Sequence, residues 1–338
     1  MISHEIEIEV TTICDAKCVM CPRDEYLFNF KSMDFHLFKK ILDDAVAKGA
    51  VSVLLCGFGD IFLDKGLEKK LQYCRETYPQ IKLFTPSTCS RLIPKNIHLL
   101  DYLDTLKISM YGMTKQSYEA IHRGMLKFET VWQNIHNILE YRKTMSHPLY
   151  VAMNFVVLPE NEKDMNAWRE YWEPLVDEIQ IWKPHNYGGI ENHLFPAVEV
   201  PKKRSCGRPF HGAPCVHENG DVSVCCFDND HKLNIGNLKE QTLEVVLASD
   251  ALAHIREVHR TGRFDESDLI CKTCDQLTDR QDALLYASNK NRKAGVLMGH
   301  PDILNDVLGK MSTIDLSETT QLPSATRPIE FVRQAEKL

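Results

Sequence analysis

Two kinds of apolar pattern alternate along the first half of the chain. Strand-like segments occur at residues 6–10, 51–56, 81–85, 105–110, 149–158 and 178–182. Between them apolar residues recur at helical spacing, as in Phe35, Phe38, Ile41, Leu42 and Ala45, in Leu67, Leu71 and Cys74, and in Val131, Ile135, Ile138 and Leu139. Six such strand–helix units predict a parallel sheet, and they are fewer than the eight of a closed barrel. We therefore expect an α/β fold with an open, partial (β/α)6 barrel, and ligands at the carboxyl ends of its strands.

The pattern changes towards residue 200. Pro196, Pro201 and the basic residues 202–204 indicate a linker. Beyond it, an Asn219-Gly220 pair flanked by valines predicts a hairpin, and residues 243–258 have a helical pattern. We further expect helices at 280–286 and 302–311, and a loosely ordered tail at 312–327. The chain is thus predicted to divide into a barrel (1–200), a small α+β domain (201–280) and a helical extension with a partly disordered tail (281–338).

Composition and charge narrow the class of protein. Of the 338 residues, 43% are apolar and 26% are charged, as in ordinary soluble globular proteins. A net charge of -7 gives no electrostatic case for binding nucleic acid or an anionic membrane. Without a signal-peptide pattern or a long apolar stretch, we expect a cytoplasmic location. In that compartment the twelve cysteines favour metal or redox chemistry over disulfides.

Three cysteines follow the first strand-like segment directly. Cys14, Cys18 and Cys21 have C-x3-C-x2-C spacing. Three thiolates can hold three irons of a cubane cluster and leave the fourth iron open to a small molecule. The alternatives are a zinc site or chance clustering, but a structural zinc site would require a fourth ligand close by.

This cysteine loop resembles that of radical S-adenosylmethionine (SAM) enzymes. The resemblance implies a 4Fe–4S cluster that binds SAM and cleaves it reductively to a 5'-deoxyadenosyl radical, which abstracts hydrogen from a substrate. It also implies the partial barrel. A reductant such as flavodoxin or ferredoxin is the expected protein partner.

The resemblance extends to candidate SAM contacts at later strand ends. Gly57-Phe58-Gly59-Asp60 stands where the family has a Gly-Gly-Glu-like segment, so backbone contacts through Gly57 and Gly59 are expected, while the shorter acid leaves a direct role for Asp60 open. Three further positions match family contacts to the SAM carboxylate or ribose: Thr88, Ser109 and Arg123. Their alternative roles are helix capping for the hydroxyls and simple solvation for the arginine.

Six of the twelve cysteines lie in the C-terminal part of the chain. This part resembles the auxiliary-cluster modules called SPASM and, in shorter form, twitch. The resemblance implies a second 4Fe–4S cluster held by Cys206, Cys225, Cys271 and Cys274. A structural zinc ribbon is the alternative for four such cysteines. Cys215 and Cys226 remain, either as small buried residues, as hydrogen-atom donors to a substrate radical or as alternative cluster ligands.

Four residues are candidate substrate contacts. Glu9 lies near the cluster loop on one face of its strand, opposite Ile6, Ile8 and Val10, and faces either the barrel interior or solvent. His185, Asn186 and Tyr187 occupy a polar loop after the sixth strand-like segment, where substrate should bind; the alternative is an exposed turn.

These features together predict an enzyme. We expect a radical SAM oxidoreductase, or an epimerase or rearrangement enzyme, acting on a small polar metabolite such as a sugar, an aminocyclitol or a natural-product intermediate. The alternatives are a peptide-modifying SPASM maturase and a non-catalytic iron–sulfur electron carrier.

Overall fold

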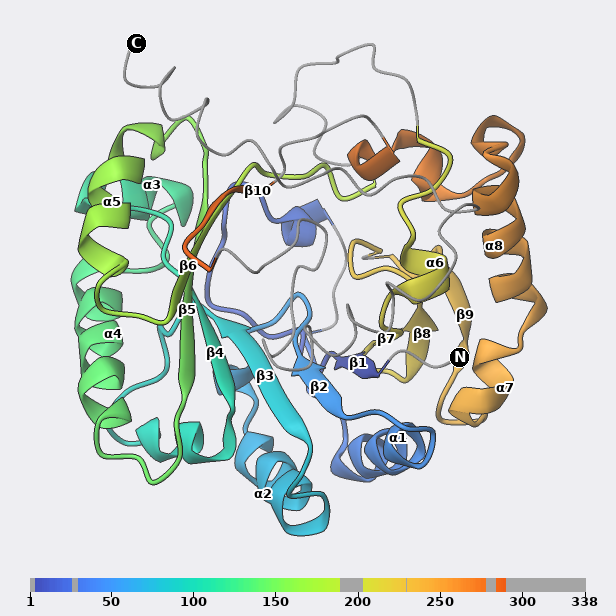
Figure 1. The fold of residues 1–338 in the computed structure, drawn as a ribbon, viewed down its shortest axis with the longest axis horizontal. Helices are drawn as coiled ribbons and strands as arrows, with labels where there is room; N and C mark the ends of the chain where they lie inside the picture. The colour runs from blue at the N-terminus through green and yellow to red at the C-terminus, as the bar shows by residue number, and fades with distance from the viewer. Residues whose placement is uncertain (1–3, 26–29, 189–202, 229, 278–283, 290–338) are drawn as a thin grey trace.

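One curved sheet organises the molecule. The computed structural model describes residues 4–25, 30–188, 203–228, 230–277 and 284–289. Within them ten strands form a sheet in the order β10-β6-β5-β4-β3-β2-β1-β7-β8-β9. Its parallel centre consists of β1 (Glu5–Ile8), β2 (Ser52–Leu55), β3 (Lys82–Ser87), β4 (Thr105–Ser109), β5 (Tyr150–Val156) and β6 (Glu178–Trp182). The sheet curves without closing (Figure 1), so the predicted open barrel of six strands is confirmed.

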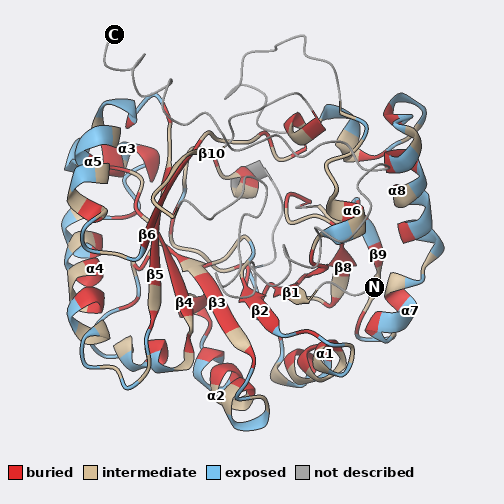
Figure 2. Cartoon of the chain, in the orientation of Figure 1, coloured by how far each residue is buried: buried red, intermediate tan, exposed pale blue. Residues whose placement is uncertain are grey.

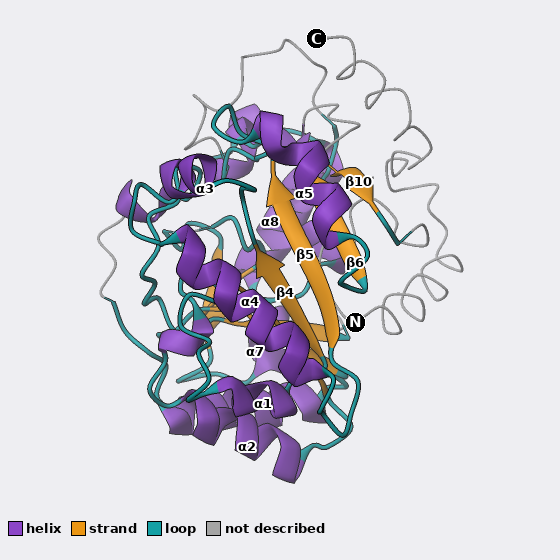
Figure 3. Cartoon of the chain, turned by 90° about the vertical axis from the view of Figure 1, so that its left-hand side faces the viewer, coloured by secondary structure: helices purple, strands orange, loops and turns teal. Residues whose placement is uncertain are grey.

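Helices cover the convex side of the barrel, as Figures 1 and 3 show. They are α1 (Phe35–Ala47), α2 (Leu67–Thr77), α3 (Lys115–Ile121), α4 (Phe128–Arg142) and α5 (Met165–Trp172). In α1 the apolar positions predicted to face inward, Phe38, Ile41 and Leu42 among them, are buried, and the Asp34 side chain caps the helix by accepting from two backbone amides. Most residues of the six central strands are buried, as Figure 2 shows.

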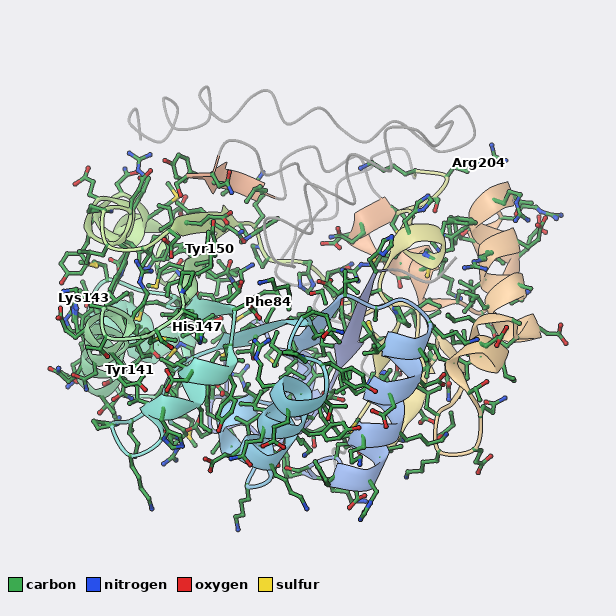
Figure 4. All side chains as sticks on the ribbon, turned by 60° about the horizontal axis from the view of Figure 1, so that its bottom comes forward. Phe84, Tyr141, Lys143, His147, Tyr150 and Arg204 are labelled. Atoms are coloured by element: carbon green, nitrogen blue, oxygen red, sulfur yellow. The ribbon has the colours of Figure 1, made fainter. Side chains whose placement is uncertain are left out.

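The outer ends of the helices hold polar contacts away from the barrel interior. Tyr141, in the last turn of α4, and His147, in the loop that follows it, are labelled in Figure 4. The Tyr141 hydroxyl donates to Asp101 Oδ2 at 2.8 Å, and His147 Nε2 lies 2.7 Å from the Asp101 carbonyl oxygen. None of the described helices combines the length and apolar character needed to cross a membrane.

Strands from the C-terminal part extend the sheet at both edges. On one side, β7 (Cys215–Val216) pairs with β1 and continues into β8 (Asp221–Ser223) and β9 (Asn234–Asn237). The predicted hairpin is confirmed, with Gly220 at φ 90° in its turn. On the other side, β10 (Leu284–Ala287) pairs antiparallel with β6.

Two predictions of secondary structure are wrong. The helix expected at 280–286 is replaced, in its described part, by β10, because the free edge of β6 offers backbone partners that local pattern does not reveal. The single helix expected at 243–258 is divided into α7 (Leu243–Leu247) and α8 (Asp250–Thr261). Ser249 divides them, since its hydroxyl accepts from Leu252 N and begins α8. The expected helix at 302–311 and the tail lie outside the described residues.

Candidate active site

The cysteine loop after β1 is fixed by backbone contacts. Arg23 Nη1 donates to the Cys14 carbonyl oxygen at 3.0 Å, and Cys21 N donates to the Cys18 carbonyl oxygen at 3.0 Å. Asp60 N donates to Ile13 O at 2.9 Å. This bond joins the cysteine loop to residues 57–60 after β2, which we call the glycine loop. The three thiols are thus presented by a loop whose backbone is tied down on both sides.

The three thiols also lie close together. Burial raises the pKa of Cys18 well above its ordinary value, and the neighbouring Cys21 and Cys14 thiols raise it further. A thiolate here therefore requires a positive partner, which iron supplies. Among the described residues, no three His, Cys, Asp or Glu side chains are arranged as ligands of a single metal ion. Thiols that are close but do not converge fit a cubane, in which each binds a different iron.

A cavity of about 290 Å³ lies at the carboxyl ends of the strands. Cys18 and Cys21 line it from the cluster loop, Asn154 from β5 and Trp182 from β6. Asn154 Oδ1 is buried and has no hydrogen-bond partner among the described residues. An unpaired acceptor beside the cluster thiols fits a ligand that brings hydrogen-bond donors, as SAM would.

The glycine loop approaches β1 and the cluster loop closely. A Cβ on Gly59 would lie 2.2 Å from the Thr11 carbonyl oxygen, and one on Gly57 would lie 2.3 Å from the Glu9 side chain. Glu9 Oε1 accepts from Phe58 N at 2.6 Å. The two glycines are therefore required for this packing, and a direct SAM contact through them remains a prediction.

Asp60 organises the next loop. Its Oδ2 accepts from Ser87 Oγ at 2.8 Å and from both the amide and the hydroxyl of Thr88 at 3.0 Å. Its Oδ1 accepts from Phe62 N, and burial raises the pKa of this carboxyl. Asp60 and Thr88 thus bond to each other, and neither lines the cavity.

The remaining two expected SAM contacts occupy different settings. Ser109 ends β4, and its Oγ accepts from the Tyr111 hydroxyl at 3.0 Å. Tyr111 itself lines the cavity, so Ser109 acts at its rim through this bond. Arg123 is exposed, with φ 50°, in the turn that follows α3, and it does not line the cavity.

His122 is a neighbour of the cluster loop that sequence reasoning missed. It is fully buried, and its Nδ1 lies 3.2 Å from Cys18 Sγ. Burial lowers its pKa to about 4, so the ring is neutral near pH 7. Its ring packs against those of Tyr118 and Tyr111. In the sequence its surroundings show only an apolar helical pattern, which does not point to a role near the cluster. Asn154 was missed too, although a polar residue inside the apolar segment 149–158 was a usable signal.

The expected substrate contacts separate into two groups. His185 and Tyr187 line the cavity, with ring centroids 4.0 Å apart. Asn186 turns away: its side chain bonds to Thr273 O and to Asp275 N. Glu9 faces the barrel interior rather than solvent. It lies beneath the glycine loop and outside the cavity lining, with its Oε2 3.2 Å from His217 Nδ1.

A second cavity, of about 110 Å³, adjoins the first. All four cysteines expected to hold the auxiliary cluster line it, namely Cys206, Cys225, Cys271 and Cys274. Burial raises the pKa of each, and that of Cys274 reaches about 12. Four thiols around one small cavity fit a second cubane in which every iron has a protein ligand.

The two leftover cysteines differ in position. Cys226 lines the larger cavity, whereas Cys225 beside it lines the smaller one. Cys215 is buried and lies 3.1 Å from Glu7 Oε2, outside both linings. Arg208, which begins α6 (Arg208–His211), lines both cavities and forms part of the wall between them.

Sequence profiles agree with this geometry. The radical SAM superfamily profile matches residues 8–171, and the SPASM profile, described as an iron-sulfur cluster-binding domain, matches residues 206–275. This chain is a radical SAM protein with a C-terminal SPASM domain. The radical SAM assignment implies a SAM-binding 4Fe–4S cluster, and the SPASM assignment implies an auxiliary one. No curated protein sequence matches the chain.

Solved radical SAM structures share the fold at low sequence identity. BtrN in complex with AdoMet and 2-DOIA has a TM-score of 0.56 and 18% identity, covering 81% of this chain and 94% of BtrN. Streptococcus suis SuiB bound to precursor peptide SuiA has a TM-score of 0.59 and 15% identity, covering 82% and 70%. The enzyme anSMEcpe with AdoMet and the Cp18Cys peptide has a TM-score of 0.56 and 14% identity, covering 81% and 87%. At these identities the similarity shows the fold alone.

Proposed function

We propose that this radical SAM protein abstracts hydrogen from a small polar metabolite, such as a sugar, an aminocyclitol or a natural-product intermediate. The observation that carries the proposal is the shared cavity of about 290 Å³, which Cys18 and Cys21 line together with His185 and Tyr187. A cavity of this size, at the carboxyl ends of barrel strands, suits a small molecule beside the cluster.

The auxiliary site supports oxidation as the leading outcome. When bound, SAM would supply the 5'-deoxyadenosyl radical and the auxiliary cluster an acceptor for an electron. The protein's part is to hold the two sites on either side of a shared wall that includes Arg208 and Phe227, and to limit the access of water with aromatic rings. His185 stacks on Phe227 with centroids 3.8 Å apart.

Epimerisation is the second candidate outcome. Cys226 places a sulfur in the substrate cavity, from which a thiol can return a hydrogen atom to a substrate radical. Cys215 bonds to Glu7 and to Cys226 and lines neither cavity, so of the two expected donors Cys226 is the better placed.

The decisive experiment measures SAM cleavage. Anaerobically reconstituted protein, reduced with dithionite or with a flavodoxin or ferredoxin, is expected to form 5'-deoxyadenosine from SAM. The variant with Cys14, Cys18 and Cys21 replaced by alanine should lose this activity and fall from about eight irons to about four per chain. Reconstituted wild type that holds both clusters and forms no 5'-deoxyadenosine would support the electron-carrier alternative.

A peptide substrate is the main alternative substrate class. It is favoured by the fold shared with SuiB and anSMEcpe, whose structures hold peptides. The two classes are separated by which compounds raise 5'-deoxyadenosine formation above the uncoupled rate. Stimulation by a precursor peptide encoded beside this gene, and by no small metabolite, would replace the proposal.

A further inference from the structure

The wall of the larger cavity carries positive charge. Lys107, Lys183 and Arg208 line it, and none of its described lining residues is an aspartate or a glutamate. The interaction between charges strengthens where water is excluded, so such a lining favours a ligand with a negative group.

The three cations reach the cavity from separate elements. Lys107 lies in the middle of β4 and is only 7% exposed, with its Nζ 5.5 Å from the Trp182 ring centroid. Lys183 directly follows β6. Arg208 comes from α6, on the other side of the barrel opening in Figure 1, and stacks 5.2 Å from the Phe227 centroid. The three cations thus line one cavity from three different parts of the chain.

The carboxylates inside the barrel serve other groups. Glu7 accepts from Cys215, and Glu9 accepts from the Phe58 amide and contacts His217. Glu178, deeper on β6, accepts from the Tyr150 hydroxyl and from Gln180 Nε2. These acids lie outside the cavity lining, although Glu7 and Glu5 also interact with the charge of Arg208, so a ligand meets the cations as the charged side chains of the described lining.

We infer that the substrate of this site carries a carboxylate or phosphate group, which Lys107, Lys183 and Arg208 bind. The inference rests on the proposed function and narrows its substrate class to anionic metabolites such as uronic acids or sugar phosphates. It disfavours aminocyclitols, because their ammonium groups would face the same three cations.

A series of probes that differ in charge tests this on the wild-type protein. Reconstituted protein loaded with SAM is dialysed anaerobically to equilibrium against glucuronate, glucose 6-phosphate, glucose or glucosamine. We expect one or both anions to bind at least about tenfold more tightly than glucose, and glucosamine to bind most weakly. Comparing the two anions tells whether the site selects a carboxylate or a phosphate.

Matched variants locate the preference. Lys107→Gln and Lys183→Gln should each bring the affinity for the anion close to that for glucose, whereas Lys115→Gln, an exposed lysine on α3, should leave the preference intact. Anions that bind no better than glucose, or no retention of any probe, would overturn the inference. So would variants that lose affinity for SAM while keeping the preference, since the lysines would then bind the SAM carboxylate.

The proposed function has its own readout. Uncoupled formation of 5'-deoxyadenosine does not depend on which sugar binds. Protein that cleaves SAM but shows no preference for anions refutes only this inference, whereas protein that fails to cleave SAM refutes the proposed function.

Discussion

At the scale of single residues, the adjacent pair Cys225 and Cys226 divides two sites. The chain turns directly after β8, where Asp228 N donates to the Cys225 carbonyl oxygen at 3.1 Å, and the two neighbouring thiols line two different cavities. The Cys225 thiol lines the smaller cavity with the three other expected auxiliary ligands, and the Cys226 thiol lines the larger one.

Cluster content should distinguish the two thiols. Cys225→Ser removes an auxiliary ligand, so iron per reconstituted chain should fall from about eight towards about four. Cys226→Ser is the matched control and should keep about eight irons, because its side chain faces the other cavity. Iron and sulfide analysis of the two purified variants measures both. An equal loss from both variants would show that Cys226 is an alternative cluster ligand.

Asp60 offers a second prediction at this scale. Asp60→Ala removes the acceptor for Ser87 Oγ, Thr88 and Phe62 N, all in a buried setting. We expect it to lower the free energy of unfolding by about 4 kcal/mol, since four buried bonds are lost and each costs about 1 kcal/mol. Urea unfolding under anaerobic conditions measures this. Ser87→Ala, which removes one of these bonds and also the acceptor for Cys89 N, should cost about half as much.

At the scale of elements, the cluster loop and the glycine loop pack backbone against backbone. The contact between Gly59 and Thr11 leaves no space for a side chain. The Asp60 N to Ile13 O bond closes the same junction. Any displacement of the glycine loop should therefore move the cysteines as well.

Replacing Gly59 should show this coupling. In Gly59→Ala the new Cβ would lie 2.2 Å from a backbone oxygen, so one loop must shift. We expect SAM to bind about tenfold more weakly, as measured by equilibrium dialysis of the reconstituted protein. Gly66→Ala is the control, because its Cβ would meet only ordinary contacts at 3.5 Å and beyond. Unchanged SAM affinity in Gly59→Ala would show that the loops move independently.

Elements defined by local pattern were predictable from the sequence. The six barrel strands, α1 and the Asn219-Gly220 hairpin follow from periodicity and turn residues, and the two cysteine groups follow from spacing together with the family resemblance. Features that depend on distant partners were not. The segment that forms β10 pairs with β6, more than 100 residues earlier. Asn186 faces Asp275 rather than substrate for the same reason. The break before α8 was readable in principle, because Ser249 is a good capping residue.

At the scale of the whole molecule, the barrel encloses acids on its first strand. Glu5, Glu7 and Glu9 share one face of the chain at β1, opposite Ile6 and Ile8. Burial, reinforced by Glu7, raises the pKa of Glu5 from 4.5 to about 7. Between these values the folded protein holds a proton that the unfolded chain releases. Stability should therefore be greater at the acidic end of this range and decrease as the pH rises through 7.

The pH dependence of unfolding tests this directly. Between pH 5.5 and pH 8, Glu5 should lower the stability of the wild type by about 2 kcal/mol, and Glu5→Gln should lack that contribution. The measurement is the difference between variant and wild type in urea unfolding at the two pH values. A constant difference would mean that Glu5 titrates alike in the folded and unfolded chain.

The position of β1 between β2 and β7 has a practical consequence for anyone building chimeras of this protein. A graft that exchanges residues 206–275 for the same part of a relative also exchanges the neighbour of the strand leading into the cysteine loop. The incoming cassette must reproduce the two-residue register of Glu7 with Cys215 and Ile8 with Val216. Otherwise β1 and β7 would not pair, and the recombinant protein would expose an unpaired strand edge, which favours aggregation.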